Sequence, residues 1–245
     1  MKHLAYGLVL ILVLAACTTT RPAVDLDKAA EINAQLGSGY LAQGDLDLAK
    51  MKFEKALKQD PGLSAAHSGY ALLMSRLGEM GKAQKHFKKA LSLDPNDSGT
   101  LNNYGIFLCS QNKFKEADKQ FMAALRDPLY KTPEFAYTNA GRCSLKNKDE
   151  AQAEAYFGKA LQANPKFPDA LFEMANLQYT KRKYAQAQAN LQKFERYANH
   201  TPASLWLAVR VARSLGRRNE EASYSLLLKN KFPDSEEAAF LRGTK

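Results

Sequence analysis

The feature that most constrains the fold is a pattern that recurs about every 34 residues. In four successive segments an alanine stands four residues before an aromatic residue, and a second alanine follows three residues later. The members are Ala49, Phe53 and Ala56; Ala83, Phe87 and Ala90; Ala117, Phe121 and Ala124; and Ala153, Phe157 and Ala160. Apolar residues three and four positions apart share one face of a helix. Because a single unit of this length cannot bury its own apolar face, the pattern predicts a stacked array of helical repeats.

This pattern resembles the tetratricopeptide repeat, a family whose unit is a pair of antiparallel helices. Alignment on the pattern places unit starts near residues 30, 64, 98, 134, 168 and 202. The later units depart from it, since Leu191 and Phe194 replace the usual Phe and Ala, and Asn199 replaces the usual proline. The resemblance implies an all-α fold, a right-handed superhelical solenoid of about six helix pairs over residues 30–235. Residues 236–245 are then a C-terminal tail.

Small residues and turn residues recur at fixed places in the units. Small residues in the first helices are predicted to let backbones approach, with an aromatic residue filling the gap, at Gly37, Ala71, Gly105 and Gly141. A left-handed backbone conformation costs little for Gly and is tolerated by Asn. The turns inside the units are therefore expected at Gly44, Gly78, Asn112, Asn147 and Gly216.

The first residues predict export and lipidation. Residues 1–16 have the layout of a signal peptide, with Lys2 before an apolar stretch that is too short to span a bilayer comfortably. Leu14 to Cys17 resembles the lipobox of bacterial lipoproteins, in which the cysteine is acylated, and several acyl chains hold a protein stably on a membrane. Thr18 follows instead of Asp, which favours the outer membrane. Residues 17–29 are expected to form the lipidated tether and the start of the first helix. The alternative is an ordinary secreted protein with a chance cysteine.

The charge balance permits anionic partners without identifying one. The 245 residues carry 35 Lys and Arg against 25 Asp and Glu, a formal net charge of +10. Lysines gather at helical spacing on two second helices, at Lys50, Lys52, Lys55, Lys58, Lys82, Lys85, Lys88 and Lys89. A solvated convex face is the ordinary interpretation, and contact with anionic headgroups or peptidoglycan is the alternative. Nucleic acid is not expected as a partner of an exported chain.

No sequence motif indicates a catalytic, metal-binding or cofactor-binding site. The four histidines, His3, His67, His86 and His200, show no metal-binding spacing. Phosphate-binding loops and nucleophile motifs are absent from the sequence. We therefore predict a protein that is not an enzyme, with no catalytic residue, no metal and no cofactor.

The concave face of the solenoid is the predicted binding surface, because the first helices of such units line it. The apolar members assigned to partner binding are Leu41, Leu72, Ile106, Phe135, Phe172, Tyr179 and Trp206, and the polar members are Asn102, Arg142 and Asn176. Large apolar side chains on an exposed face indicate a partner, and arginines pair with carboxylates. The alternative is that these residues pack against a flanking helix in residues 25–35 or 236–241.

Cys109 and Cys143 lie in the first helices of neighbouring units, 34 residues apart. Such helices run about 9–10 Å apart, so the two cysteines could reach the separation that a disulfide requires. An oxidising compartment would favour the bond, which would join the third unit to the fourth. The alternative is two buried thiols that behave as small apolar residues.

Several segments resemble one family of repeat proteins more closely than the generic repeat. They are residues 102–109, 117–121, 128–130, 139–143 and 153–157. They resemble the type IV pilus biogenesis lipoprotein, the pilotin of the pilus secretin. The resemblance implies an outer-membrane lipoprotein, monomeric apart from its partner, that binds secretin subunits and promotes their localisation and multimerisation. One alternative is a scaffold lipoprotein of another envelope machine, for outer-membrane protein insertion or as a peptidoglycan hydrolase adaptor. The other is an enzyme or carrier acting on peptidoglycan or lipid.

Overall fold

Helices make up all the regular structure in the part of the chain that the structure describes. This structure is a computed structural model that describes residues 25–243, so the predicted leader and Cys17 lie outside the described residues. The helices are α1 (Leu26–Gln43), α2 (Leu46–Gln59), α3 (Ser64–Arg76), α4 (Met80–Leu93), α5 (Ser98–Ser110), α6 (Phe114–Ala124), α7 (Pro133–Lys146), α8 (Glu150–Ala163), α9 (Pro168–Thr180), α10 (Tyr184–Tyr197), α11 (Pro202–Ser214), α12 (Arg218–Lys231) and α13 (Glu236–Gly243).

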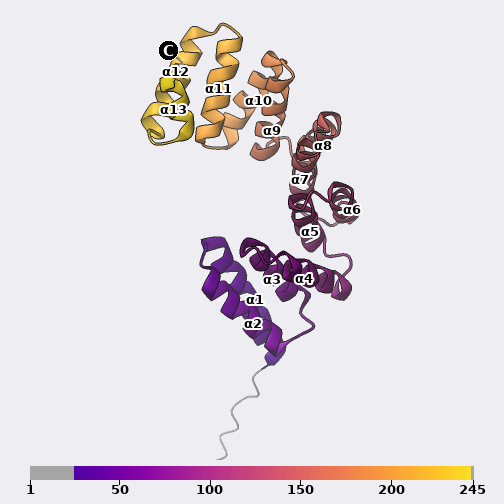
Figure 1. Cartoon of the computed structure of the whole chain (residues 1–245). Helices are drawn as coiled ribbons and strands as arrows, with labels where there is room; N and C mark the ends of the chain where they lie inside the picture. The colour runs from indigo at the N-terminus through magenta and orange to yellow at the C-terminus, as the bar shows by residue number, and fades with distance from the viewer. Residues whose placement is uncertain (1–24, 244–245) are drawn as a thin grey trace, which may run out of the picture.

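The first twelve helices form six pairs that stack in chain order. Each odd-numbered helix packs against the helix that follows it, and consecutive pairs pack on each other. Figure 1 shows the pairs following one another in a curved array, from α1 and α2 at one end to α11, α12 and α13 at the other. This architecture confirms the predicted all-α solenoid of six helix pairs.

Consecutive first helices contact one another along the array, from α1 and α3 to α9 and α11, whereas no two second helices do. In a curved stack the layer with the closer spacing is the inner one. The first helices therefore line the concave side, and the second helices form the convex side.

The repeat pattern is explained by packing around four aromatic rings. Phe53, Phe87, Phe121 and Phe157 are fully buried. A Cβ atom added to Gly105 would lie 2.6 Å from the ring of Phe121, and one added to Gly141 would lie 2.4 Å from the ring of Phe157. These rings fill the space that the glycines leave, as predicted. Replacing such a buried Phe by Ala costs about 3–5 kcal/mol.

The turn inside each pair places one residue in the left-handed region, with φ between 59° and 83°. These residues are Gly44, Gly78, Asn112, Lys148, Arg182 and Gly216. The expectation for Asn147 is wrong, because its φ is −79° and the next residue takes the left-handed conformation. The six positions are 34, 34, 36, 34 and 34 residues apart, which shows that position in the repeat and not residue type selects the turn.

A thirteenth helix packs on the last pair of the array. Residues 236–243, predicted as part of a tail, form α13, which packs on α11 and α12 and buries Ala238 completely. Leu205 and Leu228 are fully buried beneath it. The solenoid is therefore covered at its C-terminal end.

Candidate functional site

The ten residues assigned to partner binding all lie on first helices, but only some of them are exposed. Ile106 on α5 and Phe135 on α7 expose 43% and 45% of their surface. Leu41 and Asn102 are buried, with 8% exposed in each case. Leu72, Phe172, Asn176, Tyr179 and Trp206 are half-buried.

The assignment of Leu41 and Asn102 to an exposed surface is wrong because neighbouring first helices cover them. Leu41 belongs to the apolar core that includes Phe53, and its carbonyl oxygen accepts a hydrogen bond of 2.6 Å from Arg76. The Oδ1 atom of Asn102 accepts a hydrogen bond of 3.1 Å from Asn139 on α7. Both residues therefore take part in contacts between neighbouring units.

Arg142 is exposed, but its charge is neutralised within the chain. Its Nε atom donates to Glu173 at 2.7 Å and its Nη2 atom donates to Asp169 at 3.1 Å. Burial alone would lower the pKa of Arg142, and the two carboxylates outweigh it and raise that pKa. A partner carboxylate would have to displace these contacts, so Arg142 joins the fourth unit to the fifth.

The C-terminal part of the concave face is an aromatic cluster around Arg210. The guanidinium carbon of Arg210 lies 4.6 Å from the centroid of the Tyr179 ring and 5.8 Å from that of the Trp206 ring. Trp206 also contacts Phe240 of α13, with ring centroids 5.7 Å apart. The flanking-helix alternative therefore applies to Trp206.

An apolar surface that the sequence analysis missed lies on α1. Leu26, Ile32 and Leu36 expose 54%, 49% and 42% of their surface. Ile32 and Leu36 line a shallow hollow of about 350 Å³ together with Gly39 and Tyr40. Corresponding faces of later first helices are covered by the preceding unit, and α1 has no such unit among residues 25–243. The position of the first unit at the start of the array was the signal that could have revealed this surface.

Cys109 and Cys143 are joined by a disulfide between α5 and α7, with 5.8 Å between their Cα atoms. Both residues are buried, with 9% and 6% exposed. Lys146 adds two hydrogen bonds across the same boundary, to the carbonyl oxygens of Cys109 and Ser110 at 3.2 and 3.1 Å. The disulfide thus joins the third and fourth units near the middle of the array.

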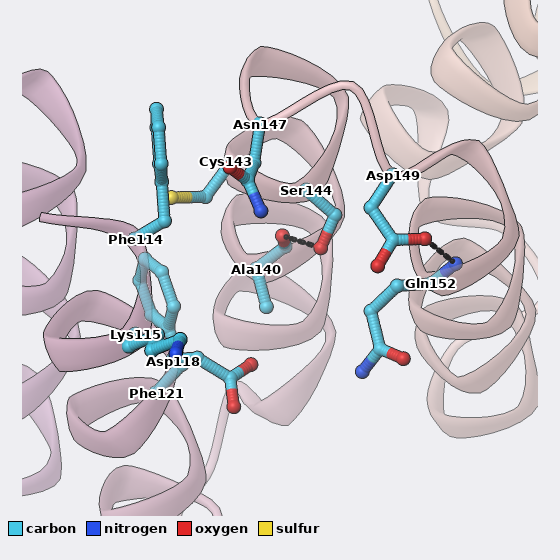
Figure 2. Close-up of a pocket in the computed structure, with 10 residues that line it drawn as sticks. All are labelled: Phe114, Lys115, Asp118, Phe121, Ala140, Cys143, Ser144, Asn147, Asp149 and Gln152. Carbon is cyan, nitrogen blue, oxygen red and sulfur yellow. Dashed lines mark hydrogen bonds between the residues drawn. The ribbon is translucent and has the colours of Figure 1, made fainter. Parts of the chain in front are cut away.

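A pocket of about 260 Å³ opens beside this disulfide, between α6, α7 and α8. Figure 2 shows its lining, with Phe114 and Phe121 on one side, Ala140 and Ser144 in the middle, and Asp149 and Gln152 on the other side. Ser144 donates to the carbonyl oxygen of Ala140 at 3.0 Å, so the hydroxyl is already bonded (Figure 2).

Asp118, at the same pocket, accepts a hydrogen bond of 2.5 Å from the Tyr156 hydroxyl. Burial, helped by this bond, raises the pKa of Tyr156 to about 12. A neutral phenol and a bonded serine do not form a nucleophile and base pair. Both hydroxyl groups therefore already have partners within the chain.

His67 and His86 lie in contact between α3 and α4. His67 and His86 face each other with 2.9 Å between their Nδ1 atoms, and burial, with His67 nearby, lowers the pKa of His86. Within residues 25–243 no group of three His, Cys, Asp or Glu side chains is placed to hold a metal ion. None of the helices described is long and apolar enough to cross a membrane.

Comparison with known proteins assigns the chain to a family. Tetratricopeptide-repeat profiles match residues 35–98, 86–125 and 144–213. The type IV pilus assembly protein PilF of Pseudomonas aeruginosa is 36% identical over 209 residues, which cover 85% of this chain and 83% of PilF. The solved structure of P. aeruginosa PilF matches with a TM-score of 0.78, at 35% identity, and covers 90% of this chain and 99% of that one. The structure of PilW, described as a widely conserved type IV pilus biogenesis factor, matches with a TM-score of 0.77, at 34% identity, over 86% of this chain and 97% of PilW. The chain therefore belongs to the tetratricopeptide-repeat family of type IV pilus assembly proteins that includes PilF and PilW.

Proposed function

We propose that this chain is an outer-membrane lipoprotein that binds subunits of the type IV pilus secretin and promotes their localisation and multimerisation. Membership of the pilus assembly family supports a role in building the pilus. The lipobox-like sequence that ends at Cys17 supports attachment by acyl chains.

The observation that carries the proposal is the exposed apolar surface of the array. Large apolar side chains that remain exposed together mark sites of protein contact. Ile32 and Leu36 are one helical turn apart on α1 and share one hollow, whereas Ile106 and Phe135 come from different units. We therefore expect the α1 face to contribute most to binding, with the concave face adding contacts.

The mechanism would consist of binding and tethering, without a chemical reaction. A tether raises the effective concentration of the bound subunit at the membrane, and a bound apolar segment is withheld from aggregation. Neither step needs a catalytic group, which agrees with the bonded state of Ser144 and Tyr156 in the pocket beside the disulfide.

The test is complementation of a deletion strain with paired surface variants. One variant carries Ile32→Ser and Leu36→Ser, and a second carries Ile106→Ser and Phe135→Ser. The matched control carries Leu129→Ser and Leu226→Ser, which remove side chains that are 82% and 60% exposed elsewhere. Secretin multimers are followed by electrophoresis, and binding is followed by co-purification of residues 18–245 with secretin fragments.

We expect the deletion to abolish secretin multimers and pili while porin levels stay normal. The α1 variant should lose multimers most strongly, and the control should restore them fully. A Cys17→Ala variant should remain folded and misplace the secretin. General loss of porins on deletion would instead identify a scaffold for outer-membrane protein insertion, and normal secretin multimers would refute the proposal.

A further inference from the structure

The second helices of units one and two, α2 and α4, carry a concentrated positive charge. α2 and α4 contain eight lysines, of which seven are exposed and one, Lys52, is half-buried. The acidic residues within the same two helices are Asp47 and Glu54, both on α2. The lysines of α4 lie opposite its buried stripe of Ala83, Phe87 and Ala90, so they point away from the array.

This charge is specific to one end of the molecule. The second helices of units four to six, α8, α10 and α12, together contain six basic and five acidic residues. Among the eight lysines of α2 and α4, Lys82 alone is within 4 Å of a described carboxylate, at 3.3 Å from Glu79. The other seven lysines therefore have no ion-pair partner within the described residues.

The position of these helices favours a membrane as the partner. Leu26, the first residue of α1, comes nine positions after Cys17, and nine residue steps span at most about 30 Å. An acylated Cys17 would hold the first two units closer to the bilayer than any other part of the chain. Met51, on the same outer face of α2 as Lys55 and Lys58, is 50% exposed. Lysines around an exposed apolar side chain are typical of surfaces that contact lipid headgroups.

We propose that the convex lysine face of α2 and α4 binds anionic phospholipid headgroups of the membrane that holds the chain. This inference rests on the proposed lipidation of Cys17 for the location of that membrane. The contact turns the convex side of units one and two toward the bilayer. The concave face is then directed away from the lipid, where a bound polypeptide can enter.

The test uses residues 18–245, which lack the acyl chains and retain every described packing contact. Sedimentation with phosphatidylcholine vesicles is compared with sedimentation with vesicles that also contain phosphatidylglycerol. One variant replaces Lys82, Lys85, Lys88 and Lys89 by Gln. The matched control replaces Lys193, Arg196, Lys229 and Lys231 by Gln, which removes the same net charge from units five and six. Circular dichroism checks that both variants stay folded.

We expect binding that requires phosphatidylglycerol and weakens as salt rises, because salt shortens the range of the attraction. Each lysine near an anionic surface contributes roughly fivefold to the partition coefficient, so the α4 variant should bind several hundredfold more weakly. The control should bind within a few-fold of the unaltered chain.

Equal weakening in the two variants would overturn the inference, because net charge alone would then explain binding. Binding to phosphatidylcholine alone would overturn it too, as would binding to purified peptidoglycan sacculi that depends on the α4 lysines while vesicles show no such dependence. Lipidation is scored separately, by labelling Cys17 with radioactive palmitate in cells. A negative labelling result would refute the lipoprotein proposal and leave the vesicle measurement interpretable.

Discussion

Removing the disulfide between Cys109 and Cys143 should weaken the array by an amount that the sequence separation sets. The bond closes a loop of 34 residues. For a loop of that length the loss of unfolded-chain entropy corresponds to about 4 kcal/mol at 25 °C. We expect the Cys109→Ala, Cys143→Ala variant to lose close to that amount in free energy of unfolding, with an added loss from two buried sulfur atoms.

The assay is urea unfolding of residues 18–245 followed by far-ultraviolet circular dichroism. The matched comparison is the unaltered protein in oxidised and reduced form, because reduction opens the loop without changing the sequence. Hydrogen exchange should locate the effect. On reduction, the exchange rate should increase more in α5 to α8 than in α1 or α12. Repeat arrays can unfold in parts, so both measurements are needed.

Coincident unfolding midpoints for oxidised and reduced protein would refute the reasoning. That result would mean either that residual contacts between these two segments already restrain the unfolded chain, or that the bond does not form. Thiol counting under denaturing, non-reducing conditions separates the two, since free thiols at Cys109 and Cys143 would show that the bond is absent.

Three further predictions follow from the repeat geometry and the buried histidines. Gly141→Ala should lower the free energy of unfolding by about 1–3 kcal/mol, because the new Cβ atom would lie 2.4 Å from the ring of the fully buried Phe157. Lys148→Gly should raise that free energy by roughly 0.5–1 kcal/mol, because it relieves a left-handed residue with φ of 62°. The pKa of His86 is lowered by burial first and by His67 and Lys85 second, so the unfolded chain binds more protons than the folded one. The free energy of unfolding should therefore show no loss from His86 above the ordinary histidine pKa of about 6.5, and it should decrease as the pH drops below that value. A His86→Gln variant should show a smaller decrease.

Each of these predictions has a control and a contrary outcome. Gly158→Ala, where an added Cβ atom meets no atom within 4 Å, should not destabilise the protein, and equal losses at Gly141 and Gly158 would contradict the packing argument. Asn147→Gly should not stabilise, since its φ of −79° is ordinary. A flat dependence of the urea midpoint between pH 7.5 and pH 5.5 would contradict the role of His86, because lowering the pH must then protonate it without cost.

The repeat could be predicted from the sequence because its cause is local. The spacing of alanines and aromatic residues is the packing pattern itself, so Phe53 and Phe157 lie in the core as the period requires. The left-handed turn at Lys148 was missed because residue type suggested Asn147, while the period of the repeat places the turn one residue later. Tertiary packing forces the conformation there on a residue that does not prefer it.

The candidate site was harder to predict, because exposure depends on the neighbours of each unit. Asn102 is assigned to the concave face by its position in the repeat, but Asn139 of the next unit hydrogen-bonds it and it is buried. Ile32 belongs to an ordinary first helix in sequence, and it is exposed because its unit stands at the start of the stack. Such differences between equivalent positions do not appear in a pattern that treats the units alike.

The packing of α13 on the last helix pair makes the two ends of the array different. At the end near Leu228, α13 packs over the last pair and buries Ala238 against it, while Phe240 stays 50% exposed. At the opposite end Ile32 and Leu36 offer an exposed apolar face. A helix supplied by another polypeptide could therefore join the stack on the α1 side and become its first layer.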